Sequence, residues 1–329
     1  MSGFALTLLK WFREHGRDLP WRQTRDPYAI WLSEIILQQT QVKQGWDYWL
    51  RFMRRWPTVA DLAAATEDEV LRQWQGLGYY SRARNLHAAA KQVLARGGFP
   101  TTIEGLRQLK GVGDYTAAAI GSIAFGLPAA VVDGNVYRVL ARHYGIETPV
   151  GSTAAKKEFT ALAQSLLPAG RPGDFNQGMM DFGALQCTPA APPCAICPLA
   201  ASCAALATGR VEGLPVREKG PAVQTRRFDY VYVRFRGRTA IRRRGPGDIW
   251  TGLYEPLTNS HSGLDPESLT LLKSNVKHQL THRTLLVDFY LWEPAEEPAL
   301  PEGYFWIEEA ELDRYAKPRL FELLLASLP

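Results

Sequence analysis

Hydrophobic residues recur at helical spacing through the first 205 positions of the 329-residue chain. Each amphipathic stretch ends at glycine or proline, residues that interrupt helices, at Gly16, Pro57, 76–78, 97–100, Gly145 and 170–173. The pattern therefore predicts an all-α region over residues 1–205.

The pattern changes after residue 205. Residues 206–224 mix glycine, proline and charges of both signs without a period, which predicts a linker. Two later runs, 228–235 and 285–292, are rich in aromatic and β-branched residues, and 312–328 has helical spacing. We expect a small α+β domain over residues 225–329, so that the fold class is a helical region followed by an α+β domain.

Composition narrows the class of protein. The chain is 46% hydrophobic, and no apolar run reaches the ~18 residues of a membrane span. The short apolar start, 4–9, runs directly into charged residues, so we expect no secretory leader and a cytoplasmic location without a membrane partner. A formal net charge of +5 permits a polyanionic partner without requiring one. The arginine-rich run 226–244 fits a solvated strand surface at least as well as a phosphate contact.

The only four cysteines lie within seventeen residues of one another, spaced C-x6-C-x2-C-x5-C, at Cys187, Cys194, Cys197 and Cys203. In a reducing compartment such a group indicates a metal rather than disulfides. Zinc sites usually bring two short knuckles, and only one is present here. All-cysteine ligation instead suits a [4Fe-4S] cluster. Zinc and free structural thiols remain the alternatives.

A glycine-rich turn separates two helical patterns at Lys110, Gly111, Val112 and Gly113. Such a hairpin can aim backbone N–H groups and the start of the next helix at one phosphate. It therefore predicts a contact with the DNA backbone, although many ordinary helix–helix turns also contain two glycines.

Two carboxylates are distinguished by their surroundings. Glu34 has Ile30, Trp31 and Leu37 beside it at helical spacings of three and four, so we expect burial to make it hold its proton. Asp133 precedes a helix, where the ionised form is favoured. A proton donor beside a charged carboxylate is the requirement for cleaving a glycosidic bond. The alternatives are an ion-paired core glutamate and a simple N-cap.

Together these residues resemble the adenine DNA glycosylase (MutY) family of the helix-hairpin-helix superfamily. The order and spacing of the shared motifs cover nearly all of residues 1–205. The motifs are the Leu-Pro-Trp-Arg sequence at 19–22, the segments 31–40, 76–85, 132–136 and 175–177, the hairpin 109–117 and the cysteine loop.

The resemblance implies a DNA repair enzyme that acts as a monomer on double-stranded DNA containing adenine opposite 8-oxoguanine or guanine. In this family Glu34 would protonate a flipped-out adenine, Asp133 would stabilise the sugar cation and Asn135 would orient groups at the site. Other matching positions imply an adenine pocket at Leu19, Trp21, Arg22 and Gln177, and residues that wedge into the duplex at Gln39 and Tyr79. The four cysteines would hold the cluster, and binding to DNA would place the protein at the nucleoid.

Tyr115 separates two branches of the superfamily. The related endonuclease III enzymes that also nick the strand carry a lysine at this position, whose amine forms a Schiff base with the sugar. Tyrosine has no such amine, so the resemblance implies a monofunctional enzyme that leaves an abasic site. The alternatives are an aromatic anchor for the hairpin at Tyr115 and an endonuclease III-like glycosylase for oxidised pyrimidines.

The second half resembles, more loosely, the Nudix-like recognition domain of the same family. The metal-binding Nudix box is absent around 252–273, so we do not expect pyrophosphate hydrolysis. Leu280, Thr281 and His282 occupy the place of a Phe-Ser-His loop that reads 8-oxoguanine. Leu280 lacks the aromatic ring, whereas Thr281 keeps a hydroxyl. A lesion-binding scaffold without chemistry is the competing hypothesis, but it needs neither Glu34 nor Asp133.

Overall fold

The computed structural model describes residues 2–218, 223–258, 264 and 266–329. The chain divides into two compact units, each formed by two separate segments. Unit 1 comprises residues 1–63 and 88–219, and unit 2 comprises residues 64–87 and 220–329. Of the predicted linker 206–224, residues 219–222 lie outside the described residues.

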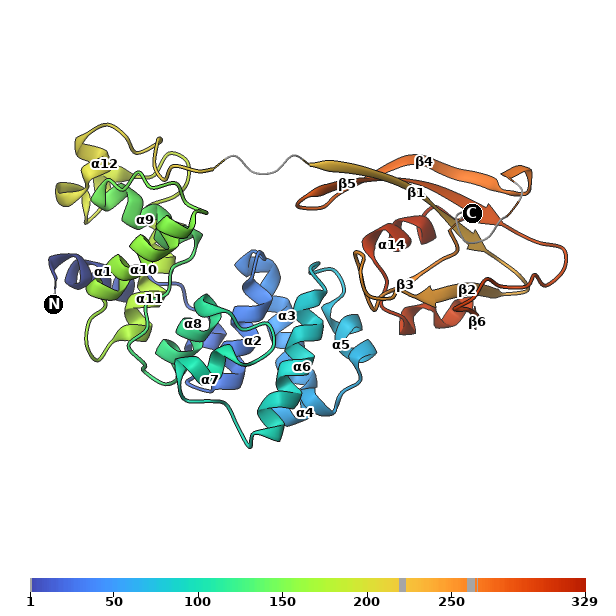
Figure 1. Ribbon diagram of the computed structural model, residues 1–329, viewed down its shortest axis with the longest axis horizontal. Coiled ribbons are helices and arrows are strands. Elements are labelled where there is room, and N and C mark those ends of the chain that lie inside the picture. Colours follow the sequence, from blue (N-terminus) through green and yellow to red (C-terminus); the bar gives the residue numbers. More distant parts are fainter. Residues whose placement is uncertain (1, 219–222, 259–263, 265) are drawn as a thin grey trace. The chain divides into compact units, whose positions relative to one another are not determined.

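Unit 1 is helical (Figure 1). Its main helices are α1 (Gly3–His15), α2 (Pro27–Leu37), α3 (Val42–Arg55), α4 (Val59–Ala64), α7 (Ile103–Arg107), α8 (Asp114–Ala124), α9 (Gly134–Tyr144), α10 (Thr153–Leu166), α11 (Pro172–Asp181) and α12 (Ala204–Ala207). α6 (Ser81–Ala95) begins in unit 2 and ends in unit 1. A π-helical turn, Phe182–Gln186, extends α11 up to Cys187.

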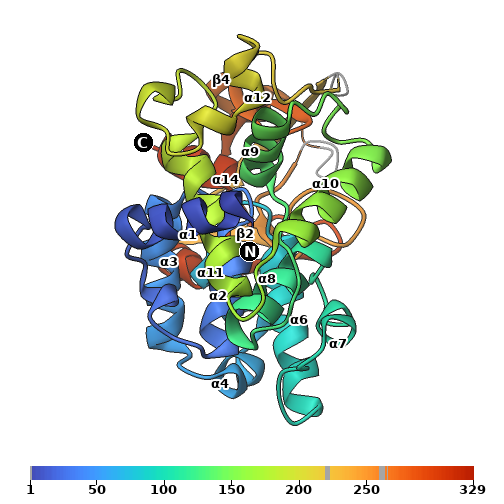
Figure 2. The same cartoon turned by 90° about the vertical axis from the view of Figure 1, so that its left-hand side faces the viewer.

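Two groups of helices form the core of unit 1. In one, α1 packs on α11 (Figure 2), and Phe4, Leu8, Phe159 and Phe175 share a buried cluster with residues of α9. In the other, α2 packs on α8. Every residue of α2 from Tyr28 to Ile36 is buried, because this helix is apolar on nearly every side, with Ser33 and Glu34 as exceptions. Among the described residues, no helix is long and apolar enough to cross a membrane.

Unit 2 contains two three-stranded sheets. In the first, β5 (Arg283–Trp292) lies between β1 (Gln224–Val233), which is parallel to it, and β4 (Thr270–Gln279), which is antiparallel. In the second, β2 (Arg238–Arg243) lies between β3 (Tyr254–Glu255) and β6 (Tyr304–Glu308), both antiparallel. α14 (Arg319–Leu325) packs on β1, and its Phe321 joins Tyr230 and Phe289 in the core.

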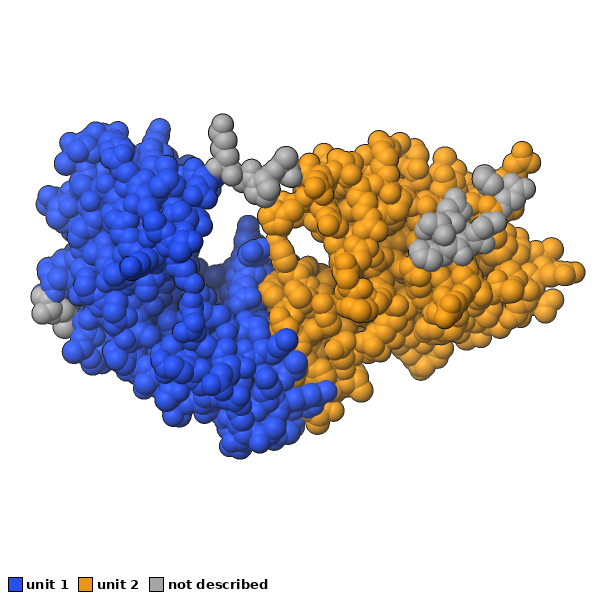
Figure 3. Space-filling model, viewed as in Figure 1, with its two compact units in different colours: residues 1–63, 88–219 blue, residues 64–87, 220–329 orange. Residues whose placement is uncertain are grey.

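Residues 64–87 belong to unit 2 (Figure 3), although the sequence pattern places them in the helical half. This segment contains α5 (Glu67–Trp74), whose start carries a capping box made by Thr66 and Glu69. Gln75 accepts a hydrogen bond from the Lys317 amide at 3.1 Å, and Tyr254 donates one to Asp68 at 3.0 Å. These tertiary contacts have no local sequence signal.

The predicted fold class is confirmed: a helical region is followed by a small α+β domain. β1 and β5 contain the two predicted strands almost in full. The single helix predicted over 312–328 is wrong in part. Residues Glu309–Arg314 form a 3-10 turn, and α14 begins only after Pro318, because proline disfavours helical geometry at the residue before it.

Candidate active site

A cavity of about 260 Å³ in unit 1 brings together eight of the residues predicted from the sequence. Five elements supply them: the 3-10 turn Pro20–Arg22, α2, the start of α8, the start of α9, and α11. The predicted residues that line the cavity are Leu19, Trp21, Arg22, Glu34, Tyr115, Asp133, Asn135 and Gln177. The two acids, the tyrosine and the four expected pocket residues therefore share one cavity.

Glu34 is a buried carboxylic acid on α2, with 9% of its surface exposed. Burial raises its pKa to about 7, and the nearby charge of Asp133 acts in the same direction. A hydrogen bond with Tyr115 and the positive charge of Arg22 oppose this rise. Glu34 therefore carries a proton in a large part of the molecules at neutral pH, as the sequence predicts.

Tyr115 connects α8 to the acid. Its hydroxyl forms a hydrogen bond with the Glu34 carboxyl group and lies 3.4 Å from the Met180 sulfur. Burial and the neighbouring carboxylates raise the pKa of Tyr115 well above its usual value. The phenol therefore stays protonated and acts as a neutral hydrogen-bonding group rather than a nucleophile.

Asp133 caps α9, as predicted. One carboxylate oxygen accepts the Val136 amide at 2.8 Å, and the other accepts the Asn135 side chain at 2.9 Å. The expectation that the helix start keeps its pKa low is wrong in direction. Burial raises the pKa of Asp133, and the hydrogen bonds from Val136 and Asn135 only partly offset this effect.

Arg22 is held by an acid that sequence reasoning missed. Asp181 is fully buried and accepts hydrogen bonds from Arg22 at 2.6 and 2.8 Å. Arg17 donates to the same carboxylate at 2.8 Å through Nε. Burial alone would raise the pKa of Asp181, but these hydrogen bonds outweigh it and lower the pKa. The sequence offered one signal for Asp181, which is that it is a single acid in the otherwise apolar run 178–183.

A second cavity of about 730 Å³ also has Glu34 and Asp133 in its wall. It adds Gln39, the hairpin residue Gly113 and Lys156. Gln39 has a φ of 55°, a conformation that costs a non-glycine residue energy and is common at functional sites. Glu34 and Asp133 therefore lie in the walls of both cavities, of which we call the smaller the inner cavity and the larger the outer cavity.

The predicted hairpin has the expected turn at Gly111, where φ is 76°, whereas Gly113 is extended and caps α8 without a side chain. Val112 is buried, and Lys110 and Gly111 are exposed. Asp114 forms ion pairs near this helix start with Lys156 at 2.7 Å and Arg107 at 2.9 Å. Backbone N–H groups and cations thus lie together at the hairpin.

In unit 2, Tyr79, Leu280, Thr281 and His282 line one cavity of about 750 Å³. The Tyr79 and Thr281 hydroxyl groups form a hydrogen bond across 202 positions of sequence. Tyr79 is 45% exposed and has a φ of 46°, a second strained residue at a predicted contact. The structure therefore joins two residues that the sequence predicts to lie near a lesion.

The four cysteines all line one small cavity of about 30 Å³ in unit 1, next to Arg142. The Arg142 guanidinium lies 3.5 Å from the Cys187 sulfur, and Cys203 donates to the Arg142 carbonyl at 3.5 Å. Within the described ranges, no three metal-ligating side chains are grouped tightly enough to hold a single ion. The convergence of four sulfur donors beside a cation fits an iron–sulfur cluster.

Comparisons with known proteins match both halves of the chain. A model described as HhH-GPD superfamily base excision DNA repair protein matches residues 32–168, and a NUDIX domain model matches 230–327. Human adenine DNA glycosylase is 45% identical over 242 residues, which cover 67% of this chain and 44% of the human protein. This chain therefore spans less than half the length of that relative.

Two further relatives are covered over most of their length. The adenine DNA glycosylase of Buchnera aphidicola subsp. Baizongia pistaciae is 32% identical over 298 residues, 87% of this chain and 84% of that protein. A solved structure of a thermostable thymine-DNA glycosylase aligns with a TM-score of 0.57 and 32% identity, over 62% of this chain and 95% of that one.

Proposed function

We propose a base-excision reaction for this chain, which belongs to the family of adenine DNA glycosylases. The resemblance seen in the sequence motifs is thereby confirmed at the level of the family. The proposed reaction is the hydrolytic removal of adenine from double-stranded DNA, leaving an abasic site. The observation that carries the proposal is the pair of Glu34 and Asp133 in one cavity, with the pKa of Glu34 raised to about 7.

The proposed reaction starts with an adenine flipped out of the duplex into the inner cavity, because its glycosidic bond is inaccessible in the stack. Protonated Glu34 donates its proton to N7 of the base, which makes the base a better leaving group. Cleavage of the C1′–N9 bond leaves an oxocarbenium-like sugar. Ionised Asp133 stabilises this cation until water adds to C1′, and the proton that the water loses returns to the Glu34 carboxylate.

The surrounding residues orient these groups. Asn135 donates to Asp133 and accepts a hydrogen bond from Arg138 at 2.9 Å, so its amide is fixed from both sides. Arg22 is fixed by Asp181 at the wall of the same cavity. The first arrangement limits the motion of the Asp133 carboxylate, and the second fixes the position of a positive charge that acts on Glu34.

The monofunctional outcome rests on the absence of a suitable amine. Tyr115 occupies the position of the strand-nicking lysine and stays protonated. Among the described residues that line the two cavities, Lys156 is the only amine, and Asp114 holds it at 2.7 Å. We therefore expect borohydride to trap little or no protein on DNA, and efficient trapping would contradict this part of the proposal.

The preference for adenine opposite 8-oxoguanine, and more weakly opposite guanine, is assigned to unit 2. Its support is the cavity lined by Tyr79, Leu280, Thr281 and His282, in which two hydroxyl groups already meet. The hairpin at Lys110 to Gly113 would contact the DNA backbone, and the protein would act as a monomer. Gln39 would enter the duplex beside the flipped base.

The cysteine loop would hold a [4Fe-4S] cluster. Cys187, Cys194, Cys197 and Cys203 supply its four ligands, and the Arg142 guanidinium balances part of the negative charge of the thiolates. The cluster would fix the fold of the loop, because its ligands come from a segment with only short 3-10 turns of its own.

Single-turnover excision assays on matched duplexes test the proposal. The duplexes carry adenine opposite 8-oxoguanine, guanine or thymine, and further duplexes carry thymine opposite guanine or an oxidised pyrimidine. We expect release of adenine, fastest opposite 8-oxoguanine, with an alkali-sensitive but uncut strand. Release of pyrimidines would favour the endonuclease III-like alternative, and tight binding without release of any base would favour a lesion-binding scaffold.

A further inference from the structure

Unit 2 contains a cavity that the proposed reaction does not use. Its volume is about 310 Å³, at the lower end of the range typical of small-molecule sites. Its wall is formed mostly by Arg226 and Phe228 of β1, Arg242 and Arg244 at the end of β2, and residues 245, 246, 248 and 249 of the following turn. It is therefore a polar cavity with arginines from two different sheets.

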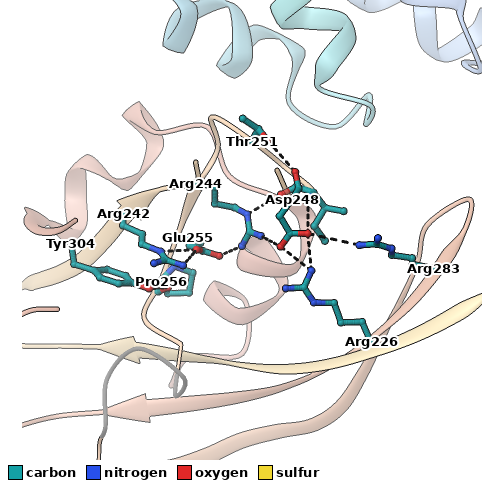
Figure 4. Close-up of polar contacts among 10 residues, drawn as sticks. Arg226, Arg242, Arg244, Asp248, Thr251, Glu255, Pro256, Arg283 and Tyr304 are labelled. Carbon is teal, nitrogen blue, oxygen red and sulfur yellow. Dashed lines mark hydrogen bonds and ion pairs between the residues drawn. The ribbon is translucent and has the colours of Figure 1, made fainter. Parts of the chain in front are cut away.

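The arginines are grouped around two acids (Figure 4). Glu255, with 1% of its side chain exposed, accepts hydrogen bonds from Arg242 at 2.8 Å and from Arg244. Asp248 accepts from Arg226 at 2.7 Å and from Arg244 at 2.9 Å, and Arg283 lies 3.8 Å away. The acids thus fix the planes of the guanidinium groups around the cavity.

The charges of this cluster do not cancel. Among the described residues of this cluster, four arginines (226, 242, 244 and 283) face two acids (248 and 255), which leaves a balance of two positive charges (4 − 2). Burial alone would raise the pKa of Asp248, but hydrogen bonds from Arg226 and the Ile249 amide outweigh it and lower the pKa. The Asp248 carboxylate is therefore ionised at neutral pH and is held by the arginines around it.

Within the part of the chain that the structure describes, hydrogen-bond donors also remain unpaired, in the cavity wall at Arg226 and, outside the lining residues, at Tyr230. The described residues provide no partner for Nε or Nη2 of Arg226, whose Nη1 alone contacts Asp248. The hydroxyl of Tyr230, two positions after Phe228 on the same face of β1, is fully buried and lacks a partner among the described residues. That hydroxyl lies within the electrostatic influence of the cluster, because, beyond the effect of burial, Glu255 raises its pKa and Arg244 and Arg226 lower it. Buried polar groups of this kind normally have a partner.

We propose that this cavity binds a small phosphomonoester dianion, either inorganic phosphate or the phosphate of a mononucleotide. Arginine binds phosphate oxygens through paired N–H groups, and a dianion balances the two excess positive charges. The Phe228 ring and the Ile249 side chain supply an apolar wall beside the charged end of the cavity, where the organic part of a mononucleotide would lie.

Charge and access favour this ligand over a phosphate inside a DNA duplex. An internal phosphodiester carries one negative charge and is joined on both sides to bulky sugars. Arg244, with 12% of its side chain exposed, lies deep in the cluster. A terminal phosphate on a small molecule can reach it, whereas an internal phosphodiester would meet mainly Arg226 and Arg283, which are each 43% exposed.

The first test is calorimetric titration of the full-length protein, at fixed salt, with inorganic phosphate, deoxyadenosine 5′-monophosphate and deoxyadenosine. We expect both phosphate compounds to bind and deoxyadenosine not to bind. Arg226→Gln should weaken both affinities at least tenfold. The matched control is Arg227→Gln, which removes the same charge from the neighbouring position on the opposite face of β1, where Arg227 contacts Asn275.

The second test uses the unaltered protein, so that it does not depend on the folding of a variant. Phenylglyoxal labels accessible arginines, and mass spectrometry reads the labelling of each one. Deoxyadenosine 5′-monophosphate should protect Arg226 at least several-fold and leave Arg227 unprotected. Equal labelling with and without the nucleotide would overturn the proposal, as would equal affinities for the two variants.

A third experiment repeats the labelling with DNA and tests the remaining explanation, which is that the cavity contacts the DNA backbone. A blunt duplex without terminal phosphates is added at the same salt concentration in place of the nucleotide. If the duplex protects Arg226 and the two phosphate compounds do not, the cavity is a contact for the DNA backbone and the proposal is wrong. Protection by the small phosphates alone supports it. Neither outcome depends on whether the protein excises adenine.

Discussion

At the scale of single residues, Glu34 shows how burial sets the chemistry of a carboxylic acid. The apolar neighbours on α2 remove water from it, and Asp133 adds a like charge. Tyr115 and Arg22 act in the opposite direction and limit the rise of its pKa to about 7. The proton is thus held at neutral pH but remains transferable to a weakly basic ring nitrogen.

Single-turnover excision should depend on pH through both acids. Glu34 must be protonated to act, so the rate should fall as the pH rises through about 7. Asp133 must be ionised, so the rate should also fall at acidic pH. Because the pKa of Asp133 is raised, this fall should begin at a higher pH than for an ordinary aspartate. Glu34→Gln should lower excision at least ~100-fold while DNA affinity stays within a few-fold. Near-normal excision by this variant would exclude Glu34 as the acid.

The same substitution should change stability in a pH-dependent way. The folded-state pKa of Glu34 is raised, so its ionisation opposes folding, a cost that begins above its unfolded pKa and is complete above about 7. Glu34→Gln removes this cost, which is on the order of 3 kcal/mol for a rise from 4.5 to about 7 at 1.36 kcal/mol per pKa unit. The unfolding temperature of the variant, relative to that of the unaltered protein, should therefore be higher at pH 8 than at pH 4. A constant difference between the two pH values would contradict this account.

At the scale of elements, the start of α9 has a structural role and, in the proposed reaction, a catalytic one. Asp133 satisfies the Val136 amide as an N-cap and places its carboxylate in the cavity with Glu34. The π-helical turn after α11 similarly ends at Cys187, the first cysteine of the loop. Helix ends therefore position most of the chemically important groups in unit 1.

Asp133→Asn should separate these two uses. Asparagine caps helices about as well as aspartate, so the unfolding temperature should change by only a few degrees. The charge that stabilises the sugar cation is lost, and excision should fall at least ~100-fold. Asp133→Ala, as the matched comparison, should lose both activity and about 1 kcal/mol of stability. An active Asp133→Asn protein would show that Asp133 is only a cap.

The cysteine loop should contain iron. Protein purified without oxygen should be brown, with about four irons and four sulfides per chain, because four sulfur donors line one cavity. Cys197→Ser should lower the iron content and destabilise the loop, whereas Ser202→Ala, next to a ligand but outside the sulfur set, should leave it unchanged. Stoichiometric zinc without iron in the wild-type protein would overturn the assignment.

At the scale of the whole molecule, the division of the chain matters for specificity. Residues 64–87 carry Tyr79 into unit 2, where its hydroxyl meets Thr281. The acids and the inner cavity lie entirely in unit 1. Removal of the base and recognition of the opposite base are therefore assigned to different units.

Ending the chain after Glu218 should keep adenine excision, although more slowly, and abolish most of the preference for 8-oxoguanine over guanine. This end point retains the Arg142 contact with the Leu214 carbonyl at 3.0 Å and the Val150 contact with Val216 at 2.9 Å. Thr281→Val in the full chain should lose part of the same preference, because one specific base contact is typically worth ~1 to 3 kcal/mol.

The measurement compares excision rates opposite the two bases. Activity opposite guanine should stay almost unchanged in Thr281→Val, and Thr284→Val, three positions further on in β5, serves as a control for a general effect on the sheet. Equal loss on both substrates would mean that unit 2 contributes general affinity, and the assignment of recognition to Thr281 would fail.

The sequence by itself determined the features that depend on near neighbours in the chain. Hydrophobic periodicity located the helical region and the strands β1 and β5, and glycine and proline marked the helix ends. Asp133 was identifiable as a cap, and the apolar neighbours of Glu34 on one helix indicated its raised pKa. Motif spacing led to the family. These features are local because they depend on residues within about one helical turn.

Only the tertiary structure decided the features that depend on distant segments. Burial outweighs the helix start at Asp133, because other helices close the cavity around it. Asp181 holds Arg22 from 159 positions away, and Tyr79 meets Thr281 from 202 positions away. Three members of the arginine run 226–244, Arg226, Arg242 and Arg244, proved to be paired with Asp248 and Glu255 around a cavity. Desolvation and charge pairing are set by whatever packs around a group, and sequence spacing carries no record of that packing.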